Sequence, residues 1–121
     1  MADRKPEIRN AKIESASITM RDHGCCTFYI SVKGGGWGCN IGGYCIGKGY
    51  LGAKEFSATP KGLECLMRIM DTVGVERWED LAGKYIRIVD NGWGSIISKF
   101  GHITDDKWFD FKAFFAEGST E

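Results

Sequence analysis

The sequence predicts an α+β fold: a mainly antiparallel twisted sheet of about five strands, with one main helix packed on it and a short C-terminal helix. Extended apolar runs bounded by turn residues lie in both halves of the chain, and one amphipathic segment with capping signals lies between them. The 121 residues suit a single domain over 10–115. Segments 1–9 and 116–121 hold few apolar side chains, so we expect flexible termini.

Residues 10–32 carry the signals of a β-hairpin. The first run, 10–20, changes the phase of its apolar residues near Ser15, which predicts a bulge. Turn residues follow at 21–24, and apolar side chains then alternate with polar ones as far as Val32. We therefore expect two adjacent antiparallel strands.

Glycine is concentrated in the middle of the chain, where nine of the 17 glycines fall within residues 34–52. This stretch also contains Trp37, Tyr44 and Ile46, which are bulky strand-forming residues. Such residues argue against a disordered linker. The segment predicts a third, irregular strand flanked by loops.

Residues 61–73 predict the main helix. Thr59 is a good N-cap, Pro60 suits the first helical position, and Gly74 stands where a C-terminal cap belongs. Apolar residues recur at helical spacing between these caps. The residues that we expect to be fully buried against the sheet are Leu66, Met67 and Met70.

The C-terminal third predicts three further elements. A short helical turn is expected at 76–81, and two β-branched runs, 84–89 and 93–100, are joined by Asn-Gly, a strong hairpin signal. Residues 105–115 start with acidic caps and continue with many aromatic side chains. This last segment predicts a short helix that covers an open side of the sheet.

Composition narrows the possible classes of function. Sixteen basic and sixteen acidic residues cancel, so no global field favours general nucleic-acid binding or an anionic membrane. No apolar run approaches the roughly 20 residues of a membrane span, and the charged start of the chain is not a secretory signal. We therefore expect a cytoplasmic protein whose five cysteines are reduced.

Motifs for catalysis and metal binding are not evident. The chain contains no dinucleotide fingerprint, nucleophile elbow or zinc-protease motif, and no Ser or Thr follows Lys48 as a P-loop requires. Cys25 and Cys26 are adjacent, and Cys39 and Cys45 are separated by five residues, which does not fit structural zinc. We expect no catalytic residue, no metal and no cofactor.

The glycine-rich segment 34–49 is the best candidate for a binding site. Glycine lets backbone amides approach a ligand and form anion-binding nests, and nearby aromatic and basic side chains could contact a nucleobase and its phosphates. The candidate ligand-binding residues are Trp37, Gly42, Gly43, Tyr44, Lys48, Asp22, His23 and Arg87. The alternative interpretation is that the glycines serve a bulged strand and that both aromatic residues are core.

Six short strings resemble a family of small proteins encoded by tailed bacteriophages and prophages. They lie at residues 10–15, 22–24, 42–44, 77–81, 83–87 and 107–109. The sequence departs from the pattern of that family at 39–41, where Cys-Asn-Ile precedes the glycine pair. The resemblance implies a phage accessory protein, without a settled enzymatic role, acting in the cytoplasm of the infected host cell.

Small phage proteins of this kind often counter host defence, and the leading hypothesis is a homo-oligomeric sponge that sequesters a cyclic or modified nucleotide signal. The alternative is an anti-CRISPR type inhibitor that binds a host defence protein directly. A third, an enzyme acting through His23 and a cysteine, ranks last. A sponge requires a deep pocket, whereas a protein-binding inhibitor requires an exposed apolar or acidic patch.

Overall fold

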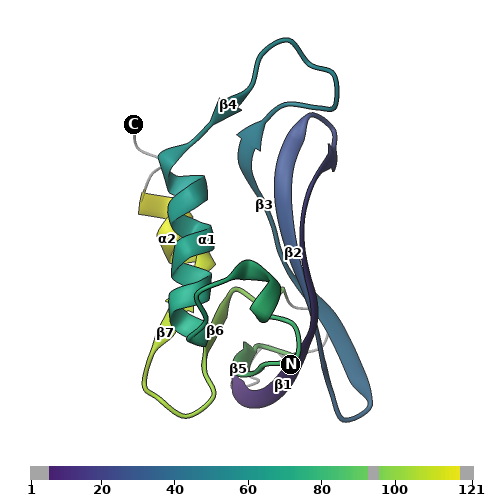
Figure 1. The fold of residues 1–121 in the computed structure, drawn as a ribbon. Coiled ribbons are helices and arrows are strands. Elements are labelled where there is room, and N and C mark those ends of the chain that lie inside the picture. Colours follow the sequence, from purple (N-terminus) through teal and green to yellow (C-terminus); the bar gives the residue numbers. More distant parts are fainter. Residues whose placement is uncertain (1–5, 93–95, 118–121) are drawn as a thin grey trace.

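Figure 1 shows the computed structural model, which describes residues 6–92 and 96–117. Within those residues the elements, in chain order, are β1 (Glu7–Asp22), β2 (Cys25–Gly34), β3 (Trp37–Lys48), β4 (Ser57–Ala58), α1 (Pro60–Val73), η1 (Trp78–Asp80), β5 (Tyr85–Asp90), β6 (Lys99–His102), β7 (Trp108–Asp110) and α2 (Phe111–Glu117). Neither α-helix of this described part is long and apolar enough to cross a membrane.

Seven strands in the described part of the chain form one antiparallel sheet, in the order β4-β3-β2-β1-β5-β6-β7. The sheet curls into a half-barrel around α1 (Figure 1). The prediction of about five strands is therefore wrong. Strands β4 and β7 have only two and three residues, too few to show an alternation of apolar and polar side chains.

The first hairpin is confirmed. Strand β1 pairs with β2, and its register shifts between Ile13 and Ser15, where the bulge is predicted. The side chains of Phe28, Ile30 and Val32 are buried because alternate residues of β2 face the core. Strand β1 begins at Glu7, so it includes part of the segment expected to be a flexible terminus.

Helix α1 has the predicted caps. The hydroxyl of Thr59 accepts a hydrogen bond from the Gly62 amide at 2.9 Å, and Gly74 adopts a left-handed φ of 96° at the C-terminal end. Its buried residues are Gly62, Cys65, Ile69, Thr72 and Val73. The predicted buried face is therefore wrong, since Met67 is exposed and Leu66 and Met70 are only half-buried.

Small residues explain which face of α1 points inward. A β-carbon at Gly62 would overlap the backbone carbonyl of Ile46, so glycine lets the first turn of the helix approach β3 closely. The buried thiol of Cys65 lies one turn further along the same face, and Ile69 follows. The buried face of α1 therefore includes the small residues Gly62 and Cys65, which apolar periodicity does not select.

The second hairpin differs from its prediction. Strand β5 pairs with β6, which begins at Lys99. Of the predicted strand 93–100, residues 93–95 lie outside the described residues, and 96–98 are not in a strand. The predicted helix at 105–115 begins only at Phe111, because β7 occupies residues 108–110 and extends the sheet.

Candidate functional site

The predicted site residues on β3 are spread along the strand. Trp37 starts β3 and Lys48 ends it, so these two residues stand at opposite ends of 12 residues. At about 3.3 Å per residue, this separation is roughly 35 Å. The Trp37 ring and the Lys48 ammonium group, which were proposed to contact one nucleotide, are therefore not brought together.

Tyr44 lies in the aromatic core. Its ring stacks on Phe111 and Phe115, with centroid separations of 5.4 and 4.8 Å, and on Phe28 at 6.3 Å. Burial raises the pKa of the Tyr44 hydroxyl above its usual range. The Tyr44 ring is thus in contact with aromatic side chains of the protein itself.

Gly42 and Gly43 form the bulge that turns Tyr44 inward. Tyr29 pairs with Gly42 and Thr27 pairs with Cys45, so two residues of β3 stand opposite one residue of β2. Both glycines have left-handed φ angles, of 115° and 88°. A β-carbon at Gly42 would lie 2.5 Å from the carbonyl oxygen of Phe28.

Replacing Gly42 with alanine should therefore destabilise the fold by at least about 2 kcal/mol, through backbone strain and overlap with Phe28. Gly35 is the matched control, because apart from its chain neighbours nothing lies within 4 Å of the position that a β-carbon would occupy. Gly35→Ala should change stability by less than about 0.5 kcal/mol. Urea unfolding measures both, and equal small effects would contradict a structural role for the bulge.

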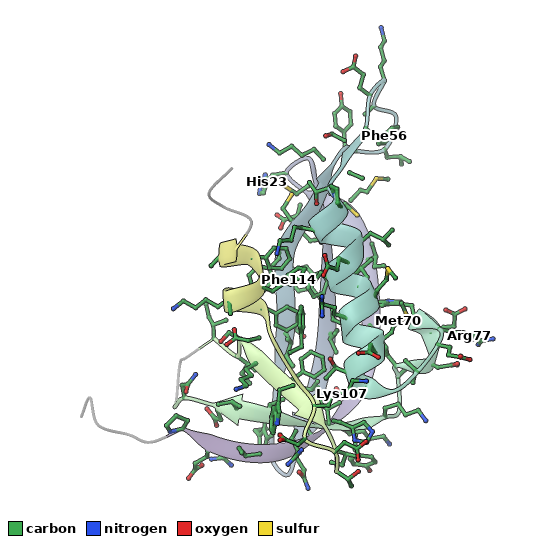
Figure 2. The ribbon with its side chains drawn as sticks, turned by 90° about the vertical axis from the view of Figure 1, so that its left-hand side faces the viewer. His23, Phe56, Met70, Arg77, Lys107 and Phe114 are labelled. Carbon is green, nitrogen blue, oxygen red and sulfur yellow. The ribbon has the colours of Figure 1, made fainter. Side chains whose placement is uncertain are left out.

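Asp22, His23 and Lys48 gather at one end of the sheet. Asp22 pairs with Cys25 across the first hairpin turn, and Cys25 pairs with Lys48 on β3. His23 occupies that turn with a left-handed φ of 54° (Figure 2 labels it). These polar residues lie near the base of the β3–β4 loop, since the Gly49 amide donates a hydrogen bond to the Gly24 carbonyl.

Arg87 lies away from these three residues, and its side chain is held by contacts within the protein. Its guanidinium donates hydrogen bonds to the carbonyl oxygens of His102 and Asp105, at 2.8 and 2.7 Å, and stacks 4.6 Å from the Trp108 ring. These contacts fix the loop between β6 and β7. Trp37 likewise packs on the protein itself, because its indole lies where a β-carbon of Gly34 would be.

An apolar groove of about 370 Å³ lies where the hairpin β1–β2 extends past the start of α1. The helix begins at Pro60, so it leaves the inner side chains at this end of the strands uncovered. Lys48 is the one charged residue among those that line the groove. The lining residues are Ile18, Met20, Cys26, Ile46, Gly47, Lys48, Gly49, Phe56, Ser57, Ala58, Thr59, Leu63 and Leu66.

Large apolar side chains are exposed around the groove, in the β3–β4 loop and on α1, and together we call them the apolar tip. It includes the protruding β3–β4 loop, whose Phe56 is labelled in Figure 2. Leu51 in that loop is 89% exposed, and Leu63 on α1 is 63% exposed. The large apolar side chains of the apolar tip are Ile18, Met20, Tyr50, Leu51, Phe56, Leu63 and Met67.

The size of the apolar tip is unusual for a surface without a partner. Taking roughly 200 Å² as the full surface of a large apolar residue, its exposed fractions amount to about 800 Å². The largest apolar patch on a typical monomer is about 300–600 Å², whereas a standard protein interface buries about 800 Å² per partner. The summed exposed area of these seven residues is therefore close to the area of one side of a standard interface.

Sequence reasoning missed this surface because it is assembled from β1, the β3–β4 loop and α1. One signal was visible: Ile18 and Met20 share a strand phase opposite to that of the core residues Ala11 and Ile13. A second was the apolar pair Tyr50-Leu51 in a glycine-flanked loop. Neither signal indicates a site by itself.

Metal ligands do not gather in the described part of the chain. No group of three or more His, Cys, Asp or Glu side chains is arranged there to hold an ion, and all five cysteines are free. Burial raises the pKa of the Cys65 thiol to about 12, which makes it chemically inert.

Comparisons with protein-family models, with curated proteins and with solved structures give no match. The geometry of the site is therefore the basis for the proposed function.

Proposed function

We propose that the protein is a non-catalytic binding protein that docks on a partner protein through the apolar tip. The observation that carries this proposal is an apolar groove lined by exposed large apolar side chains, with more of them in the adjoining β3–β4 loop and on α1. The partner implied by the resemblance to phage accessory proteins is a host defence protein. This is the second of the two binding functions that the sequence suggests.

The composition of the apolar tip supports a protein partner over a nucleotide. Apolar and aromatic side chains enriched at the centre, with few charges, are typical of the buried core of protein interfaces. A nucleotide needs several cations or amides converging on its phosphates. Beside Lys48 and the Cys26 thiol, the polar side chains that line the groove are those of Ser57 and Thr59, and Thr59 is engaged in capping α1.

Replacing Leu63 with lysine should weaken partner binding at least tenfold, or about 1.4 kcal/mol, because it places a charge on the apolar lining of the groove. Leu63 is exposed, so the fold should be unchanged. Tyr85→Lys is the matched control, since Tyr85 is also exposed but lines a different hollow, with Asn10 and His102.

The experiment compares tagged wild type and both variants in affinity purification from a bacterial lysate, followed by titration of the purified partner. A protein held by wild type and Tyr85→Lys but lost by Leu63→Lys supports the proposal. A partner held equally by all three would contradict it. A saturable rise in melting temperature with cyclic nucleotides, unchanged in Leu63→Lys, would instead support the sponge.

A further inference from the structure

Strand β3 has a second neighbour over only a small part of its length. On one side it pairs with β2 from Trp37 to Lys48, whereas on the other side β4 pairs only with Gly47 and Lys48. Residues 37–45 make no further backbone hydrogen bond within the part of the chain that the structure describes. Because an antiparallel strand directs alternate backbone groups to each side, this stretch leaves N–H and C=O groups unpaired on its free side.

The first half of this stretch, residues 37–42, is regular, and we call it the open edge. It follows β2 without a register shift, since the bulge comes after it. The turn that joins β2 to β3 lies well apart from α1 and α2 in Figure 1. The Trp37 indole folds over Gly34 on β2, away from the free side, and Gly38 and Asn40 are exposed. A strand from outside the molecule can therefore reach the open edge.

The open edge lacks the features that commonly prevent edge strands from pairing with another chain. Those features are charged side chains, proline and a very short strand. The open edge contains no charged residue and no proline, and the glycines at 38 and 42 add no side chain that would cover the backbone. Glycine within a strand often marks the close approach of another backbone.

Strand β1 also has a free side, because its pairing with β5 covers only residues 7–12. Its segment 14–22, however, carries Glu14, Arg21 and Asp22, and charged side chains are one of the features that protect an edge. The same segment contains no glycine. The two edges therefore differ in charge and in the space beside the backbone, and both differences favour the open edge of β3 as the place where a strand is added.

We infer that the open edge pairs with the open edge of a second copy of this chain, antiparallel about a twofold axis, so that the two sheets join into one. In such a pair the same segment lies on both sides of the interface. Because the open edge has no charge, two copies bring no like charges together. The exposed side chain between its glycines is the amide of Asn40, which both donates and accepts hydrogen bonds and can therefore bond to a second amide like it.

This dimer leaves the apolar tip of each copy free. The open edge starts at Trp37, whereas the groove is lined by the other end of β3, at Ile46 and Lys48. A dimer therefore presents two apolar tips, which raises the avidity for a partner that offers two binding sites. The inference goes beyond the proposed function and does not depend on it.

Sedimentation velocity of the full chain over a range of concentrations tests the inference, and a reversible monomer–dimer equilibrium is expected. Asn40→Lys should weaken dimerisation at least about tenfold, because it places like charges on both sides of the interface. Ser31→Lys is the matched control. Ser31 pairs with Asn40 on β2 but has Ser15 of β1 on its other side, so it lies one strand away from the interface. A monomeric wild type, or equal weakening by the two variants, would overturn the inference.

Hydrogen exchange of the wild type locates the interface without any substitution. Amides of residues 37–42 should exchange more slowly when the protein is concentrated enough to dimerise than when it is dilute. Amides of residues 14–22 and of the loop 49–56 should exchange at the same rate in both samples. Slower exchange in 14–22 would assign the interface to β1, and slower exchange in 49–56 would assign it to the apolar tip, so either result would overturn the pairing through β3.

Discussion

Replacing Phe111 with alanine is expected to lower the free energy of unfolding by about 3–5 kcal/mol, the range for truncating a buried aromatic residue. Phe111 is fully buried at the start of α2. Its ring contacts those of Phe28, Tyr44, Phe100 and Phe109, at centroid separations of 5.7, 5.4, 5.7 and 4.8 Å. These neighbours come from β2, β3, β6 and β7, so one side chain joins both halves of the sheet.

Urea unfolding followed by circular dichroism measures this loss. Phe56→Ala is the control, because Phe56 is 63% exposed and its removal should cost less than about 1 kcal/mol. A small domain has only about 5–15 kcal/mol of total stability, so Phe111→Leu is the milder variant to measure if Phe111→Ala does not fold fully. Equal stabilities of the Phe111 and Phe56 variants would show that the aromatic cluster does not hold the fold together.

The sequence predicts those elements whose signals are local. The caps of α1 were readable because Thr59, Pro60 and Gly74 occupy positions with strict backbone requirements. The first hairpin and its bulge near Ser15 were readable because a change of apolar phase requires one extra residue. Each of these signals lies within a few residues of the feature that it specifies.

The remaining features depend on contacts between distant segments. Strands β4 and β7 exist because neighbouring strands offer unpaired edges, and not because two or three residues favour an extended chain. The segment 34–49 contains several candidate ligand-binding side chains that are close in sequence. Because the segment forms an extended strand, these side chains are far apart in space. The bulge at Gly42 and Gly43 turns Tyr44 towards Phe111 in the aromatic core.

Ile69→Ala should lower the free energy of unfolding by about 2–5 kcal/mol, because it opens a cavity where α1 meets the sheet. Ile69 is fully buried, whereas Met67, two residues earlier, is 57% exposed on the other side of the helix. Periodicity alone placed Met67 in the core, so the two variants compare the predicted face with the observed one.

Met67→Ala should change stability by less than about 1 kcal/mol, and alanine favours the helix at both positions, so helix propensity does not explain a difference. Both free energies come from urea titrations of the full chain at the same pH. Equal losses would mean that α1 is rotated relative to the face described above. A larger loss for Met67→Ala would restore the face expected from apolar periodicity and remove Met67 from the apolar tip.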